Sequence, residues 1–314
     1  MTLLATAVER VRGFGSVPLV ERGDAPLALV LPGLFLFSAF LLFPLLYLFY
    51  LSFTDAAPQT LFAGEQQFIG FENYVNLLTT WRFWNSLGVT WLFLVTSVLL
   101  KIAVGIGMAL VLDHHLVRGK RLLRAMVIVP LALPPIFVIA VWRGMFSTAR
   151  YGVINQAMIA VGLEPVAWLQ RRWMAFLAYN VTEVWLATPF MFIIIVSALQ
   201  SVPEELHDAA KVDGAGYLSR FVHVTLPSIK RPVWFASILT AAASFQQFLI
   251  PFVFNQGGPA RRNELILVHG YREAFAFNEY GQGAAIMIMA LLFIGAFMWL
   301  NVKKGRLAEG IHNQ

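Results

Sequence analysis

Residues 208–227 read DAAKVDGAGYLSRFVHVTLP, a polar stretch between two long apolar segments. It contains the small pair Ala209 and Ala210 and, shortly after, Gly214. Small side chains let a partner backbone approach closely, and glycine permits a sharp turn between two short helices. The stretch therefore predicts a compact polar loop, built from short helices, that projects from a very apolar protein.

The composition indicates that this protein is embedded in a lipid bilayer. Apolar residues make up 59% of the 314 residues and charged residues 13%, and the mean hydropathy is +0.70. A soluble domain carries about 25% charged residues. The absence of cysteine excludes disulfides and thiolate metal sites. The net charge of +6 is typical of basic cytoplasmic loops, so no nucleic-acid partner is expected.

Six apolar segments are long enough to cross a membrane, which takes roughly 20 residues. None alternates with a period of two, so we predict an all-α polytopic membrane protein. The predicted spans run from Leu27 to Phe53, Leu87 to Leu112, Ala125 to Phe146, Met174 to Leu199, Pro232 to Phe254 and Gln282 to Val302. The third contains three prolines, and we expect it to be kinked and packed inside the bundle.

The chain is expected to consist of an N-terminal tail (1–26), a membrane domain (27–302) and a C-terminal tail (303–314). The first tail has no apolar signal core, so the first span is expected to be retained. Lys and Arg number 14 in the two tails, the loop between the second and third spans and loop 200–231, against 7 on the opposite side. The positive-inside rule then places both termini and loop 200–231 in the cytoplasm.

Loop 200–231 carries helix signals. Ser201 and Glu204 have the S-x-x-E spacing of a capping box, which predicts a helix that begins near Val202. Glu205 and Asp208 complement the positive end of its dipole.

A second short helix is predicted over Ala215–Val222, with Asp213 as its cap. Two short helices joined at Gly214 would form a stiff projection, which can transmit a rigid-body motion.

Residues 208–227 resemble the EAA loop of bacterial ABC importer permeases, in which a short cytoplasmic helix docks into a groove on an ATPase subunit. The chain departs from the pattern at Asp208, where Glu is usual; the charge is kept and one methylene is lost. The resemblance implies that loop 200–231, here named the coupling loop, contacts the ATPase through Glu204, Glu205, Asp208, Ala209, Ala210, Asp213 and Gly214.

Two further segments resemble this family. Residues 255–259, NQGGP, match the Gly-Gly-Pro turn that commonly ends the fifth helix of carbohydrate-type permeases. Residues 68–74, FIGFENY, match a Gly-aromatic-Asn-Tyr segment that commonly precedes the second helix, although an interfacial turn with aromatic anchors explains them equally well.

The resemblance also implies a substrate site. Residues 244–248, SFQQF, place uncharged amides beside aromatic rings, which suits a sugar; the alternative is an amide that only packs helices. Residues 185–190, WLATPF, contain a Pro near which maltose-type permeases place an aromatic on the path; plain aromatic packing is the alternative. The predicted substrate residues are Leu186, Phe190, Thr240, Ser244, Gln246 and Gln247.

Two charges fall inside predicted spans. Lys101 and Glu183 are expected to seek partners, and a pair between them would serve as structural glue or an interface contact rather than a proton relay. His114 and His115 diverge on a helix, so no metal site is expected. No Walker motif occurs, so this chain is expected neither to be an enzyme nor to bind a cofactor.

The resemblance as a whole implies a permease subunit of an ABC importer in the bacterial cytoplasmic (inner) membrane, moving a di- or oligosaccharide such as maltose, trehalose or a related glucoside by alternating access. The implied partners are a second permease subunit, two ATPase subunits that hold ATP and Mg, an external solute-binding protein and membrane lipid. A secondary transporter driven by an ion gradient is the alternative, and it would predict inverted repeats with intramembrane acids. A membrane enzyme is a third class, but the sequence holds no cluster of nucleophile, base or metal ligands.

Overall fold

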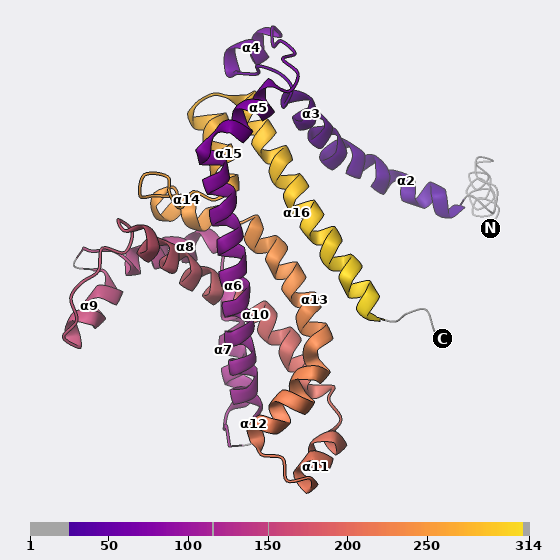
Figure 1. Ribbon diagram of the computed structural model, residues 1–314, viewed down its shortest axis with the longest axis vertical. Helices are drawn as coiled ribbons and strands as arrows, with labels where there is room; N and C mark the ends of the chain where they lie inside the picture. Colours follow the sequence, from indigo (N-terminus) through magenta and orange to yellow (C-terminus); the bar gives the residue numbers. More distant parts are fainter. Residues whose placement is uncertain (1–24, 115, 150, 310–314) are drawn as a thin grey trace, which may run out of the picture. The chain divides into compact units, whose positions relative to one another are not determined.

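The computed structural model describes residues 25–114, 116–149 and 151–309, and it is helical (Figure 1). Within these residues there is no regular strand; Thr54 and Phe68 form an isolated antiparallel bridge. The predicted all-α class is confirmed. Most of the predicted N-terminal tail, the last five residues and His115 lie outside the described residues.

The chain divides into two compact units after Leu51. The described part of the first unit is one continuous apolar helix made of α2 (Ala25–Phe37), a π-helical turn η1 (Ser38–Leu42) and α3 (Phe43–Leu51). It corresponds to the first predicted span and ends two residues earlier than expected. The π-helix is rare and, where it occurs, is mostly a single turn inside an α-helix, as here.

The second unit holds all the remaining elements. They are α4 (Pro58–Ala63), α5 (Glu72–Thr79), α6 (Trp81–Asp113), α7 (Lys120–Ala132), α8 (Pro135–Met145), α9 (Val153–Ala160), α10 (Arg172–Gln200), α11 (Glu204–Val212), α12 (Tyr217–Arg220), η2 (Phe221–Thr225), α13 (Leu226–Phe245), α14 (Leu249–Asn255), α15 (Ile266–Tyr271), η3 (Arg272–Ala276) and α16 (Tyr280–Glu309). Helices α6, α10 and α13 pack against one another, and α16 packs against α5, α13 and α15 (Figure 1).

Five helices in the described residues are long and apolar enough to span a membrane, or six if α7 and α8 together form one span. The third predicted span is not a kinked helix, because α7 and α8 are bent by 101° relative to each other. Pro134 and Pro135 explain the break: proline removes a backbone donor and forces the residue before it out of the helical region. The expected burial is also wrong, since residues 131–137 are exposed.

The fifth predicted span is interrupted as well. Helix α13 ends at Phe245 and α14 begins at Leu249. Pro251 has no N–H to donate to the carbonyl of Gln247, so the α-helical ladder cannot run through this point. The side-chain oxygen of Gln247 instead accepts a hydrogen bond from the backbone N–H of Ile250 at 3.4 Å.

Helix α6 contributes to all three apolar clusters of the second unit. Phe83 packs in the first, Phe93 in the second and Ala109 in the third. A Cβ at Gly105 would lie 2.9 Å from Cγ of Met191, so glycine permits the close approach of α6 and α10. Gly105 and Ala109 are four residues apart, and such a spacing of small residues favours close helix packing. Helix α6 is the central support for the sites described below.

Candidate functional site

The coupling loop forms a short helical projection. Helix α11 begins at Glu204 behind Pro203, and no side chain caps it. The predicted capping box is therefore wrong: Ser201 still has helical backbone angles at the end of α10, and its hydroxyl donates backwards to the carbonyl of Ala198 at 2.8 Å.

The predicted second helix begins two residues later than expected and does not end at Val222, because α12, η2 and α13 follow one another without a gap. Asp213 is the C-terminal cap residue of α11 rather than the N-cap of the next helix, and α12 begins behind Gly216 without a side-chain cap. Gly214 does make the expected sharp turn, with φ of +80°. Its N–H bonds to the carbonyl of Lys211 at 3.0 Å, which closes the end of α11.

The predicted ATPase-contact residues share this projection. Six of them are exposed and Ala210 is half-buried. Asp208 pairs with Lys211 at 2.7 Å, with both side chains more than half exposed, so the pair adds little stability. The hydrogen bond from Lys211, with its charge, holds the pKa of Asp208 below its ordinary value.

Sequence reasoning missed the apolar part of the same surface. Val212 is 88% exposed and Leu218 is 73% exposed, and Tyr217 lies between them in sequence and is also exposed. Exposed apolar side chains that are rimmed by charges are typical of a protein-binding surface. Their signal in the sequence was the presence of apolar residues inside an otherwise polar stretch.

The coupling loop and the end of α6 line a common cavity. A cavity of about 420 Å³ lies between them, and Asp113 and His114 of α6 face Lys211, Tyr217 and Arg220 across it.

A larger, apolar cavity of about 590 Å³ lies between α6, α7, α8 and α10. Its lining includes Trp142 of α8 and Trp185 and Thr188 of α10. The two indole rings pack edge to face, with their centroids 5.9 Å apart.

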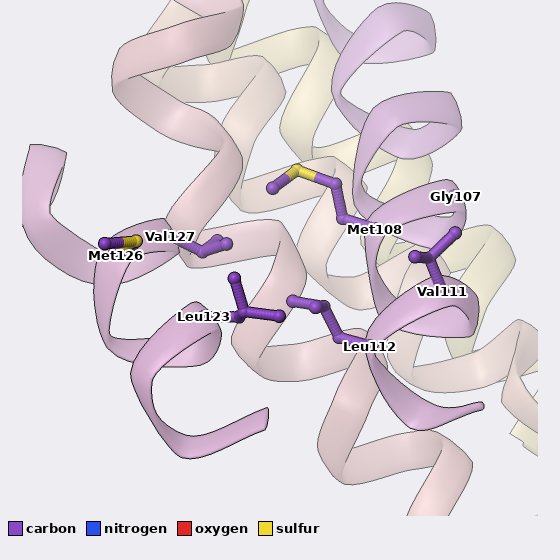
Figure 2. A pocket seen from close by; sticks show the side chains of 7 residues that line it. All are labelled: Gly107, Met108, Val111, Leu112, Leu123, Met126 and Val127. Atoms are coloured by element: carbon purple, nitrogen blue, oxygen red, sulfur yellow. The ribbon is translucent and has the colours of Figure 1, made fainter. Parts of the chain in front are cut away.

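A second cavity of about 350 Å³ continues the first one, because Met108, Met126 and Val127 line both. Figure 2 shows Leu112 of α6 and Leu123 of α7 facing each other across it. The two cavities form one apolar groove between α6 and α7.

The structure separates the six predicted substrate residues. Leu186 packs in the second apolar cluster and Phe190 in the third. Gln246 is exposed and lies beyond the end of α13. None of the six lines either cavity of the groove. The WLATPF segment does reach the cavity, but through Trp185 and Thr188 instead.

The other three predicted substrate residues, Thr240, Ser244 and Gln247, surround a buried ion pair. Lys101 Nζ lies 2.5 Å from Glu183 Oε1, with the side chains 0% and 6% exposed. Lys101 also donates to the hydroxyls of Ser244 at 2.8 Å and Thr240 at 3.2 Å. Gln247 donates to Glu183 Oε2 at 2.6 Å. The two intramembrane charges do pair, as the sequence suggested.

A second charged network holds the loop that follows α14. Arg261 bonds to Glu264 at 2.7 Å and to Glu273 at 3.0 Å, and His269 lies 3.4 Å from Glu273. A Cβ at Gly257 would lie 2.6 Å from the Cα of Glu264, so only glycine fits there. The NQGGP turn therefore packs closely against this charged network. The sequence did not reveal the network.

Comparison with known proteins agrees with this architecture. The family profile described as "Binding-protein-dependent transport system inner membrane component" matches residues 101–303. The "Trehalose/maltose transport system permease protein MalF" of Thermococcus litoralis is 33% identical over 278 residues, which cover 88% of this chain and 92% of that protein. The "Sulfoquinovosyl glycerol transport system permease protein SmoG" of Agrobacterium fabrum is 30% identical over 272 residues, covering 86% and 87%.

A solved structure shares the fold. A chain of a bacterial ABC transporter that imports the acidic polysaccharide alginate matches with a TM-score of 0.78 at 22% identity, covering 91% of this chain and 96% of that one. With its membrane-spanning helices and the family match over residues 101–303, this chain belongs to the inner membrane components of binding-protein-dependent transport systems.

Proposed function

We propose that this chain is a permease subunit of a sugar importer of the ABC type, and that the groove between α6 and α7 is its part of the translocation path. The observation that carries the proposal is the apolar cavity walled by Trp142, Trp185 and the hydroxyl-bearing Thr188. Indole faces suit the apolar faces of pyranose rings. The Thr188 hydroxyl donates to the carbonyl of Val184 and can still accept a hydrogen bond from a sugar hydroxyl. A di- or oligosaccharide of the maltose or trehalose type fits this chemistry, and the names of the relatives support it.

The other subunits supply the energy and deliver the substrate. Two ATPase subunits that hold ATP and Mg dock on α11 and α12, through the contact residues predicted above and through Val212 and Leu218. A second permease subunit completes the path, and an external binding protein delivers the sugar. The termini and the coupling loop lie in the cytoplasm. ATP binding drives the change between inward-open and outward-open forms, because it favours one of them.

The alternative of an ion-driven transporter has little support from the charges. Within the described spans, Glu183 is the acidic residue away from the helix ends, and Lys101 neutralises it. Copurification separates the two functions: an ABC permease carries an ATPase with it, whereas a secondary transporter does not.

The cavity is tested with Trp185→Ala and Trp142→Ala. Loss of one stacking indole removes about 1–2 kcal/mol of contact energy, which should raise the KM for sugar roughly tenfold. The measurement is uptake of labelled maltose or trehalose in cells that lack their own permease, normalised to the amount of assembled complex. Trp234→Ala is the control, because Trp234 is exposed on α13 and lines neither cavity.

If both cavity variants keep the KM of the wild type while the complex assembles normally, the groove is not the sugar path. The six residues predicted from the sequence would then be the next candidates. Gln246→Ala would be the first to measure, because Gln246 is the most accessible polar residue among them.

A further inference from the structure

The buried ion pair joins three helices, α6, α10 and α13, whose apolar faces also pack together in the third cluster. Lys101 comes from α6, Glu183 from α10, and Thr240 and Ser244 from α13. A single carboxylate holds them: Oε1 of Glu183 accepts from Lys101 at 2.5 Å and from Ser244 at 3.2 Å. Its other oxygen accepts from Gln247 at 2.6 Å, in the break between α13 and α14. Apolar faces can slide past one another, whereas charge-assisted hydrogen bonds fix direction as well as distance.

This network links the same two helices, α10 and α13, that the coupling loop connects, so it can affect how they move together. The coupling loop joins the end of α10 at Gln200 to the start of α13 at Leu226. At 1.5 Å per residue, Glu183 lies roughly 26 Å from Gln200 along α10, and Ser244 lies roughly 40 Å from Tyr217, where the continuous helix of α12, η2 and α13 begins. The two helices are joined at one end by the coupling loop and, further along, by the hydrogen bonds that Glu183 accepts from Ser244 and Gln247.

The Lys101–Glu183 ion pair lies next to the proposed sugar path. Val184 and Trp185, the two residues after Glu183, both line the 590 Å³ cavity. Glu183 itself is 4% exposed and points away from this cavity toward Lys101. If the coupling loop rotates α10, the distance that the cavity wall moves depends on how firmly the ion pair holds α10 to α6 and α13.

We propose that Lys101, Glu183, Ser244, Thr240 and Gln247 form a clamp that makes α6, α10 and α13 move as one body, so that displacement of the coupling loop reaches the cavity wall. These are positioning residues, which act through α10 and touch no substrate. The inference rests on the proposed function, because coupling has a meaning only in an ATP-driven importer.

The decisive variant replaces the ion pair with apolar side chains of similar volume, Lys101→Met/Glu183→Leu. Such a replacement of a buried pair is often neutral for stability, whereas loss of one partner leaves an uncompensated charge. The complete transporter, reconstituted in proteoliposomes with its ATPase subunits and binding protein, is assayed for ATP hydrolysed per sugar imported. We expect the double variant to assemble, to keep the KM for sugar, and to hydrolyse about fivefold or more ATP per sugar.

Two matched variants sharpen the result. Thr96→Val removes a hydrogen bond of 2.8 Å from α6 to Asn180 of α10, which does not involve α13, and it should keep the wild-type ratio. Gln247→Leu removes only the link to the α13–α14 break, and it should raise the ratio without changing KM. A higher KM with an unchanged ratio in Gln247→Leu would make Gln247 a substrate contact and overturn its place in the clamp.

The clamp is overturned if the double variant imports sugar with the wild-type ratio, or if it fails to assemble, because the pair would then serve folding only. The failure of the proposed function is a different outcome: the wild-type complex itself would show no ATP-dependent sugar import.

Discussion

Lys101 and Glu183 show how a membrane interior tolerates charge. Burial of each ion costs several kcal/mol, and their mutual attraction offsets this only with good geometry and additional hydrogen bonds. Here Ser244, Thr240 and Gln247 supply those bonds. Removal of one partner should cost about 3–5 kcal/mol, while removal of both should cost little. The pair therefore favours one arrangement of helices more than it stabilises the fold.

Gly214 provides a test of the coupling loop. Its φ of +80° strains any L-residue, although a new Cβ would meet open space; the strain costs about 1–2 kcal/mol. Gly214→Asp adds this strain and a charge beside Asp213. We expect lost ATPase association or uncoupled hydrolysis, with membrane insertion unchanged. The measurement is copurification of the ATPase subunits together with stimulated ATP hydrolysis.

Gly216→Ala is the control for this prediction, because φ at Gly216 is −66° and its Cβ would also meet open space. Normal transport and normal ATPase stimulation in Gly214→Asp would remove the docking hypothesis for this turn.

The bounds of the membrane-spanning helices could be predicted where a long apolar run defines them. The spans that became α6, α10 and α16 are correct to within several residues at each end, because a long apolar run has few other ways to satisfy its backbone. The breaks at Leu133–Pro134 and at Gln246–Phe248 were missed or underestimated, since proline in a membrane helix can either kink it or end it. The caps of α11 and α12 were wrong because Ser201 and Asp213 extend preceding helices.

The candidate site was only partly predictable for a related reason. The sequence singled out Lys101 and Glu183, because an intramembrane charge needs a partner. It also singled out the segment that contains Trp185. It could not show which face of α10 meets the cavity, so Leu186 and Phe190 were chosen ahead of Trp185 and Thr188. That choice depends on packing between helices far apart in the sequence.

The loop that contains α15 and η3 should be sensitive to acid. Burial raises the pKa of Glu273, but hydrogen bonds and charges from His269 and Arg261 outweigh it, so the pKa lies below its ordinary value of 4.5. The stabilisation is present in full above about pH 4.5 and is lost as the pH falls through the lowered pKa. Purified complex should therefore melt at a lower temperature at pH 3.5 than at pH 5.

Glu273→Gln should flatten this pH dependence and lower the melting temperature at pH 5, because it removes the carboxylate that Arg261 and His269 contact. An identical acid response in the variant and the wild type would assign the effect to other carboxylates.

The membrane topology can be tested on the whole chain. Fourteen basic residues on one side against seven on the other predict that both termini lie in the cytoplasm. Reporter fusions at Gly64, Gly162 and Gly257 should read external, and fusions at Gly119 and Gly216 should read cytoplasmic. The readout is a pair of enzymatic reporters that are active on opposite sides of the membrane. An external signal from Gly216 would place the coupling loop out of reach of an ATPase and contradict the proposed function.

The sharp bend between α7 and α8 has a consequence for hydration. Leu133 and Pro134 have extended backbone angles, and the stretch around them is exposed. Peptide groups outside a helix cannot face hydrocarbon, because their unpaired carbonyls lose the hydrogen bonds that water would give them. Another polypeptide or a column of water must therefore cover this stretch. In a working transporter the bend therefore marks a place where the protein meets a partner subunit or water instead of lipid.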